Sequence, residues 1–390
     1  MRAAPFASSP AHQPRADLRA DLVALDFSEL NQFDADDHLA AFGVFARSAA
    51  AICAAAVALR PARPPGRGLA AVCHRALADP PRTRPQARRF FTENFRPFRV
   101  MAPGRDGPDC GFLTGYFEPV VAGALTPSAE FGVPLLARPD DLVTLAQGET
   151  VPGVDPGLNA ARQLPQGRYG PYPERAEIEA GAIADHTRPI IWLRDRLEAF
   201  LVQVQGSARV VLPDGTTRRL VYAGRNGRPY SSLGRILVEM GEIAPQDMGL
   251  ARVKDWLYAH GLQAGEAGAA LMLRNKSYVF FTLEPDIDGA EAPIGGAGTR
   301  LSPLRSMAID RSLWSYGLPF WIAADLPWTG PAVSPFRRLM IAQDTGSAIL
   351  GPARADLFFG TGDSAGARAG EIRHKCDFVV LLPLERDEKR

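Results

Sequence analysis

The sequence predicts a mainly β protein with helices near its amino end. From about residue 115 onward, short apolar runs alternate with Gly and Pro, which is typical of short strands joined by turns. Before that point, apolar residues recur at helical spacing in the segment that follows Asp34. The pair Asp214-Gly215 separates two apolar runs, as expected for the tight turn of a β-hairpin. These three patterns place helices first and strands after them.

The amino-terminal elements follow in order. Residues 1–20 are dominated by Pro, Ala, Ser and Arg without a period, so we expect a disordered leader. A helix is expected from Asp34, whose side chain suits the cap position before an apolar stripe. A second helix is expected over 69–77, packed on the first, with the Pro- and Arg-rich segment 60–67 as the turn between them.

The middle of the chain combines a hairpin with helices. We expect strands over 200–212 and 218–222, paired through the Asp-Gly turn. A helical insert is expected over 231–273, because Gly241 and Gly261 stand where helices would stop.

The carboxy-terminal third carries the candidate chemistry. Strands resume at 278–281, and the Gly- and Pro-rich stretch 286–298 is expected to be a linker. Asp310 ends an apolar run, and Asp344 and Asp356 lie twelve residues apart around a glycine-rich turn. Because a carboxylate costs free energy to desolvate, aspartates inside apolar runs point to a chemical role.

Composition excludes several function classes. The 390 residues carry 44 Lys and Arg against 43 Asp and Glu, so the composition shows no excess of positive charge of the kind that binds nucleic acid. The four cysteines lack zinc-ligand spacing, and no histidine forms a pattern with a serine or cysteine nucleophile, so we expect no metal and no cofactor. Cys53 and Cys73 fit either a disulfide or two buried thiols.

The amino terminus offers no membrane signal. Residues 1–29 are polar and Pro-rich without an apolar run of signal-peptide length. The longest low-polarity run, 48–59, is too short to span a bilayer. Membrane association is therefore not supported by this segment.

Seven sequence blocks occur in a fixed order from about residue 115 to 383. They are GYFEP (115–119), RAEI (175–178), QVQGS (203–207), YAGRN (222–226) with Tyr230, NKSYVFF (275–281), the aspartate region (310–360), and AG (369–370) leading to VLLP (380–383). Together they resemble the membrane-bound lytic murein transglycosylase A family, whose 3D domain is named for three aspartates.

The resemblance implies a two-domain fold. Residues 21–115 and 284–390 would form a discontinuous catalytic domain containing a double-psi β-barrel. Residues 116–283 would be inserted as a second, β-barrel-like domain, with a substrate groove between the two.

The resemblance also implies roles for single residues. Asp356 would be the catalytic acid and base, and Asp344 would orient it or the sugar, although an Asx-turn role for Asp344 is equally compatible. The expected substrate-binding residues carry amide, phenol or carboxylate groups, namely Asp310, Glu118, Gln203, Gln205, Tyr222, Asn226 and Tyr230. For each of these the alternative is a buried structural polar group, and for Asp310 a structural strand-end role is favoured.

The implied activity is a peptidoglycan lyase of the periplasm. It would cleave the β-1,4 bond between N-acetylmuramic acid and N-acetylglucosamine and give 1,6-anhydromuramoyl products, with peptidoglycan glycan strands as its partner. Endolytic or exolytic action, peptide-stem specificity and cell-wall protein partners stay open. The alternatives are a non-catalytic glycan-binding scaffold and, from the motif Asp344-Thr345-Gly346-Ser347, an aspartic protease. Such a protease needs two copies of the motif, either in one chain or in a homodimer, and this chain contains a single copy.

Overall fold

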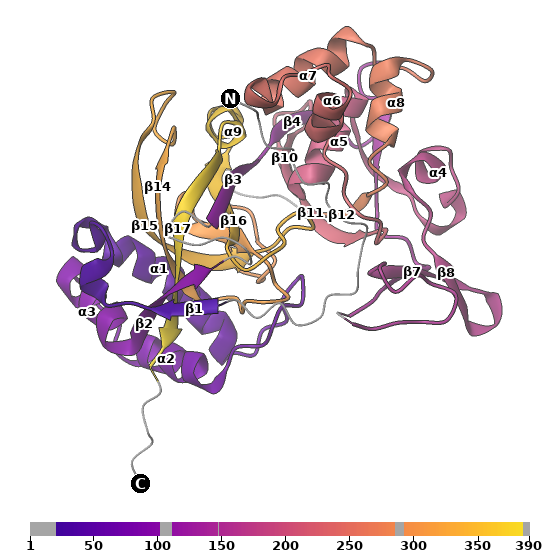
Figure 1. Ribbon diagram of the computed structural model, residues 1–390. Helices are drawn as coiled ribbons and strands as arrows, with labels where there is room; N and C mark the ends of the chain where they lie inside the picture. Colours follow the sequence, from indigo (N-terminus) through magenta and orange to yellow (C-terminus); the bar gives the residue numbers. More distant parts are fainter. Residues whose placement is uncertain (1–20, 102–110, 147, 285–291, 385–390) are drawn as a thin grey trace.

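The chain forms two β-rich halves. The computed structural model describes residues 21–101, 111–146, 148–284 and 292–384. One half combines the amino-terminal helices with the carboxy-terminal strands, and the other contains the middle of the chain (Figure 1). The expected leader 1–20 and the first part of the expected linker lie outside the described residues.

The first half is built on a closed barrel. Its strands are β1 (Asp21–Ala24), β2 (Phe95–Met101), β3 (Gly111–Glu118), β13 (Ser306–Ile309), β14 (Pro319–Leu326), β15 (Ser334–Asp344), β16 (Arg354–Thr361) and β17 (Arg373–Pro383). They pair in the order β1-β2-β17-β14-β15-β13-β16-β3, and β17 also pairs with β3. That extra pairing closes β17, β14, β15, β13, β16 and β3 into a six-stranded ring. The barrel confirms the predicted mainly β fold with amino-terminal helices.

Three helices cover this barrel, and sequence analysis found two of them. They are α1 (His38–Cys53), α2 (Arg67–Ala78) and α3 (Arg84–Asn94). The first helix begins later than predicted, because Asp34 lies in a short 3₁₀ turn and Asp37 caps α1 by accepting the Ala40 amide at 3.2 Å. The third helix was not predicted. Its Phe90 and Phe91 pack against aromatic residues of α1, which supplies the burial that stabilises it.

The second half contains a sheet that curls toward closure. Its strands are β4 (Val120–Ala124), β5 (Val133–Leu136), β9 (Pro189–Leu193), β10 (Ser207–Val211), β11 (Thr217–Arg225) and β12 (Val279–Glu284), in the order β12-β11-β10-β4-β9-β5. An isolated bridge from Ala137, just after β5, to Phe281 in β12 links the two ends of this order. A smaller sheet joins β6 (Leu142–Thr144), β7 (Ala160–Leu164) and β8 (Arg168–Pro171).

The second half contains five α-helices among its described residues, and two of them end just before the predicted glycines. They are α4 (Arg175–Glu179), α5 (Arg196–Gln205), α6 (Leu233–Glu239), α7 (Leu250–Ala259) and α8 (Ala267–Leu273). Gly241 and Gly261 adopt positive φ near the ends of α6 and α7, which confirms both as helix stops. The last helix within the described residues, α9 (Asp363–Gly370), belongs to the barrel half.

The predicted hairpin was half wrong. Residues 200–205 are the end of α5, because Leu197, Phe200 and their neighbours bury one helical face after the cap at Asp195. Gly206, at φ 81°, ends the helix, and strand β10 begins only at Ser207. The Asp214-Gly215 turn between β10 and β11 is present as predicted.

Two further observations concern the described part of the chain. None of its helices has both the length and the apolar character needed to cross a bilayer. Cys53 and Cys73 are free thiols in this structure, and burial raises the pKa of Cys73 to about 12.

Candidate active site

Asp356 lies in the barrel wall on β16. Its neighbours in register are Thr114 on β3 and Ala308 on β13. The carboxyl group is half-buried, and the Thr114 hydroxyl donates a hydrogen bond of 2.6 Å to Oδ1. Burial raises the pKa of Asp356, Arg354 and the Thr114 hydrogen bond oppose the rise, and Asp344 adds to it.

A short relay fixes the direction of the Thr114 hydrogen bond. The Arg354 guanidinium donates through Nη2 to Thr114 Oγ1 at 2.7 Å. Because a guanidinium can only donate, Thr114 accepts from Arg354 and directs its own proton toward Asp356. Oδ1 of Asp356 is thus held as an acceptor, which leaves Oδ2 available to carry a proton.

Asp344 lies at the end of β15, close to Asp356. Both aspartates pair in register with Ala308, one on each side of β13. Asp344 Oδ2 accepts the Tyr116 hydroxyl at 2.9 Å, and Oδ1 accepts the amides of Gly296 at 2.7 Å and Thr345 at 2.8 Å. Burial, followed by Asp344, raises the pKa of Tyr116 well above its usual range, so this phenol stays a donor.

Glycine at position 296 is required by this arrangement. A Cβ there would approach the Tyr316 hydroxyl to 2.6 Å and Asp344 Oδ1 to 3.2 Å. The bare backbone can therefore approach Asp344 closely enough to donate its amide.

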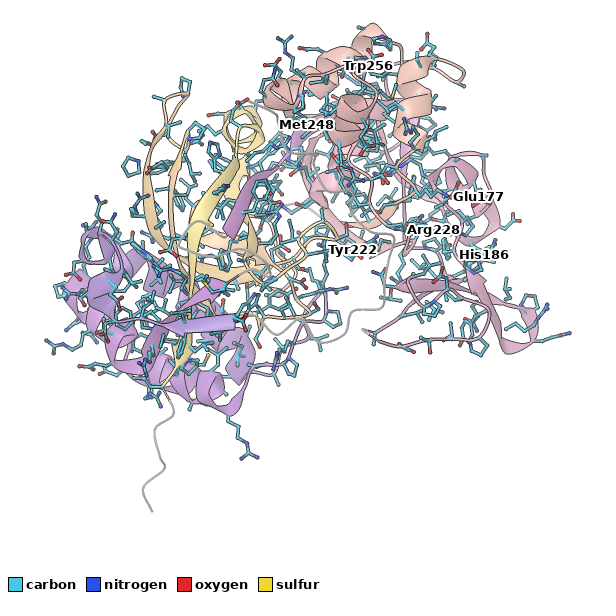
Figure 2. The ribbon with its side chains drawn as sticks, in the orientation of Figure 1. Glu177, His186, Tyr222, Arg228, Met248 and Trp256 are labelled. Atoms are coloured by element: carbon cyan, nitrogen blue, oxygen red, sulfur yellow. The ribbon has the colours of Figure 1, made fainter. Side chains whose placement is uncertain are left out.

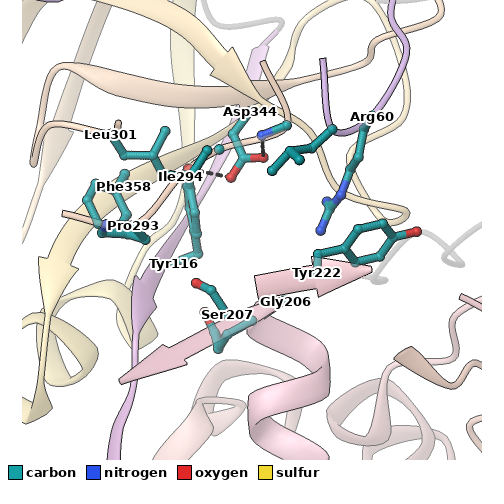
Figure 3. Close-up of a pocket in the computed structure, with 14 residues that line it drawn as sticks. Arg60, Tyr116, Gly206, Ser207, Tyr222, Pro293, Ile294, Leu301, Asp344 and Phe358 are labelled. Atoms are coloured by element: carbon teal, nitrogen blue, oxygen red, sulfur yellow. Dashed lines mark hydrogen bonds between the residues drawn. The ribbon is translucent and has the colours of Figure 1, made fainter. Parts of the chain in front are cut away.

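A pocket opens beside the two aspartates, between the halves of the molecule (Figure 3). It encloses about 350 Å³ of space, including some that is open to solvent. The barrel half contributes Leu59, Arg60, Tyr116, Pro293, Ile294, Gly295, Gly296, Leu301, Asp344 and Phe358, and the second half contributes Gln205, Gly206, Ser207 and Tyr222. Asp356 does not line this pocket directly. It lies two residue pairs along the same strands from Tyr116 and Phe358, whose rings are 5.3 Å apart.

Arg60 is a pocket residue that sequence analysis missed. Its segment was interpreted only as a turn between helices. In the structure its Nη1 donates to the Thr345 carbonyl at 2.5 Å, and its guanidinium lies 3.9 Å from the centre of the Tyr222 ring. Figure 3 shows this side chain reaching from the barrel half toward the second half. Thr114 was also missed, since a threonine just before GYFEP carries no distinguishing pattern.

Three of the seven expected substrate-binding residues line hollows on the surface. Gln205 and Tyr222 line the pocket between the halves, and Gln205 also accepts the Phe117 amide at 3.2 Å. Tyr230 lines a neighbouring, more apolar hollow formed by α5, α6 and α7, which Gln205 also borders.

Two expected carboxylates are buried supports instead. Asp310 accepts the amide and hydroxyl of Ser312 and, at 2.7 Å, the Gly351 amide, so it fastens the loop before β16. Glu118 is fully buried and binds Arg219 at 2.7 Å and Thr361 at 2.8 Å. These contacts occupy both carboxylates away from solvent, so we no longer expect either to contact substrate.

Two expected amides are also internal. Gln203 is buried and accepts Arg175 Nη2 at 2.6 Å. Asn226 donates to the carbonyls of Pro173 and Lys276 and accepts the Tyr278 amide. The hydrogen-bonding groups of the Asn226 side chain are therefore engaged inside the second half, which corrects its predicted role in substrate binding.

One group of side chains in the described part could reach a common metal ion. It consists of Asp140, Asp141 and His186. Arg162 and Tyr172 already donate to the two oxygens of Asp141, at 2.6 Å and 2.7 Å. Figure 2 places His186 on the outer side of the second half, away from the barrel. We assign this group no role at the site.

Comparisons with known proteins agree with this geometry. Residues 112–282 match the MltA specific insert domain, and residues 305–382 match the 3D domain. Membrane-bound lytic murein transglycosylase A of Escherichia coli strain K12 is 31% identical over 300 residues, covering 74% of this chain and 71% of that protein.

Two further relatives give the same family. The Vibrio cholerae protein of that name is 35% identical over 210 residues, and the match spans 52% of this chain and 54% of the relative. The crystal structure of a membrane-bound lytic murein transglycosylase from Agrobacterium tumefaciens superposes with a TM-score of 0.80 at 32% identity, covering 93% of this chain and 97% of that one. This chain therefore belongs to the MltA family of lytic murein transglycosylases.

Proposed function

We propose that this chain cleaves the β-1,4 bond between N-acetylmuramic acid and N-acetylglucosamine in peptidoglycan and releases 1,6-anhydromuramoyl ends. The observation that carries the proposal is Asp356, a half-buried carboxyl group with a raised pKa beside a pocket shared by both halves. A raised pKa keeps a carboxylic acid protonated, as general acid catalysis requires. The names of the relatives support the substrate, and we place the activity in the periplasm.

The mechanism uses one carboxyl group twice. Asp356 gives its proton to the glycosidic oxygen, the C1–O bond breaks, and positive charge develops on the muramic sugar. The sugar's own C6 hydroxyl then attacks C1 and returns a proton to Asp356. Because the nucleophile belongs to the substrate, proximity replaces the second carboxylate that hydrolytic glycosidases use to activate water.

Asp344 is proposed as the electrostatic partner. Its oxygens are held by three donors, which fixes its orientation in the pocket wall. A carboxylate fixed there raises the pKa of Asp356 and stabilises the positive charge of an oxocarbenium-like transition state. The Tyr116 hydroxyl maintains this geometry.

We also propose that the two halves are separate domains, with 21–115 and 284–390 forming one and 116–283 the other. The pairing pattern supports this division, since the barrel ends with β3 and the second sheet begins with β4. The described amino-terminal strand β1 and helices belong to the barrel side (Figure 1).

The product of the reaction tests the proposal. Purified sacculi are incubated with the protein, and the released muropeptides are analysed by mass spectrometry. Anhydro-terminated products are expected. Products with reducing ends would indicate a hydrolase, and binding without release would indicate a glycan-binding scaffold.

A further inference from the structure

Three guanidinium groups gather where the two halves meet. Arg60 lies over the Tyr222 ring, and Arg311 donates through Nη1 to the carbonyl of Pro61, the residue next to Arg60. Arg225 lies three residues after Tyr222 on β11. A bulge between Tyr222 and Gly224 determines the face of the sheet from which the Arg225 side chain projects. Because Tyr222 pairs with Phe281 and Arg225 pairs with Val279, both side chains project from the same face of the sheet.

None of the three is paired with a carboxylate inside the described ranges. Their recorded hydrogen bonds go to backbone carbonyls of Thr345, Arg228 and Pro61. Arg225 Nε is buried without a hydrogen-bond partner. Burial, and then repulsion from Arg60 and Arg311, lowers the pKa of Arg225, while Tyr222 opposes that effect. Positive charges held close together repel one another and so cost free energy in the unliganded protein. Such an arrangement is typical of a site that binds an anion.

We propose that Arg60, Arg225 and Arg311 bind a carboxylate carried by the muramic sugar of the glycan strand. The inference rests on the proposed function and adds a subsite to it. Arg60 connects the two sites, because it lines the pocket beside Asp344 and its position depends on Gly206. That glycine has φ 81°, and a Cβ there would lie 3.0 Å from Arg60 Nη2.

The chemistry of the strand identifies the anion. N-acetylglucosamine is neutral, whereas the muramic sugar carries a lactyl group that ends either in a free carboxylate or in a peptide stem with its own carboxylates. Guanidinium groups match carboxylates through paired, charge-assisted hydrogen bonds. The cluster would therefore set the register of the strand by holding a muramic substituent near the scissile bond.

Binding measurements on an inactive background test this subsite. The Asp356→Asn protein is titrated calorimetrically with three glycans of equal sugar number. One is a muropeptide strand with peptide stems, one is the same strand with free lactyl carboxylates, and one is a neutral chito-oligosaccharide. Each is repeated with Arg225→Gln and Arg311→Gln together, and with Arg252→Gln, an exposed arginine on α7, as the matched control.

The expected result is selective. The double substitution should weaken binding of a carboxylate-bearing strand by about tenfold or more for each lost charge-assisted contact and change binding of the neutral glycan less than about twofold. If the strand with free lactyl groups loses affinity, the lactyl group supplies the carboxylate. If the strand with peptide stems loses affinity, the stem supplies it. Melting temperatures of all variants verify the fold.

Two outcomes would overturn the inference. Equal losses for acidic and neutral glycans would show a structural role for these arginines, and unchanged affinity for every glycan would show that they do not bind substrate. Both leave the proposed activity intact. Failure of the Asp356→Asn protein to bind any of the glycans would instead overturn the proposed function and the subsite together.

Discussion

Replacing Asp356 by Asn should abolish the activity and leave the barrel intact. Asn has nearly the same shape, and its amide oxygen can still accept the Thr114 hydroxyl that now lies 2.6 Å from Oδ1. Its amide cannot supply the acidic proton. General acid and base catalysis is worth about 10² to 10⁴ in rate, or ~2.7 to ~5.4 kcal/mol of activation free energy, so a loss of at least that size is expected.

The same substitution should affect stability in a pH-dependent way. The folded pKa of Asp356 is raised above its ordinary value, so the folded state favours the protonated form. Its contribution to the free energy of unfolding is fully present below the ordinary pKa and is lost as pH rises through the raised one. Asn stays neutral throughout. The melting temperature of the Asp356→Asn protein relative to wild type should therefore rise as pH increases above about 4, and it should level off once the pH passes the raised pKa of Asp356.

Turbidity of a sacculus suspension and melting temperature over this pH range measure the two effects. Asp255→Asn, at an exposed position on α7, is the matched control and should change neither. A folded Asp356→Asn protein that still clears sacculi would refute the catalytic assignment. A melting temperature that falls relative to wild type as pH rises would refute the argument from burial.

Three other predictions follow from the contacts. Thr114→Val removes a hydrogen bond that stabilises the ionised acid, so the alkaline fall in kcat/KM should move to higher pH; a shift to lower pH would contradict the relay. Glu118→Ala leaves Arg219 buried without its carboxylate, so a denaturant titration should show a loss of about 3–5 kcal/mol in the free energy of unfolding. A loss below about 1 kcal/mol would show that other groups compensate the charge of Arg219. Gln205→Ala should weaken glycan binding with little change in melting temperature, whereas Asn226→Ala should mainly lower the melting temperature; the reverse pattern would return Asn226 to the substrate groove.

Local patterns predicted much of the fold. The glycine stops at Gly241 and Gly261 and the Asp214-Gly215 turn depend on backbone conformations of a few adjacent residues, so the sequence could specify them. The predicted strand over 200–212 was wrong for residues 200–205, because this apolar run is too short to distinguish the helical period from the strand period. Helix α5 forms because Asp195 caps its amino end and because one of its faces packs in the protein core.

The same distinction applies to the candidate site. Sequence patterns singled out Asp344 and Asp356 because carboxylates inside apolar runs are costly, and the two converge on Ala308 as barrel neighbours. They could not separate Gln205, which faces the pocket, from Gln203, which is buried two residues earlier in the same helix. Which face of a helix is covered depends on packing partners far away in the chain.

By itself, the sequence determined the class of fold, the family and the two aspartates, since these depend on residue type and spacing along the chain. Tertiary structure alone decided which polar residues are supports and which are free to act. It also decided that Arg60, 296 residues before Asp356 in the chain, lies in the pocket beside Asp344 and the proposed catalytic Asp356. The physical reason is that burial and electrostatic environment arise from long-range contacts, and Thr114, Arg354 and Arg60 acquire their roles only once the barrel closes.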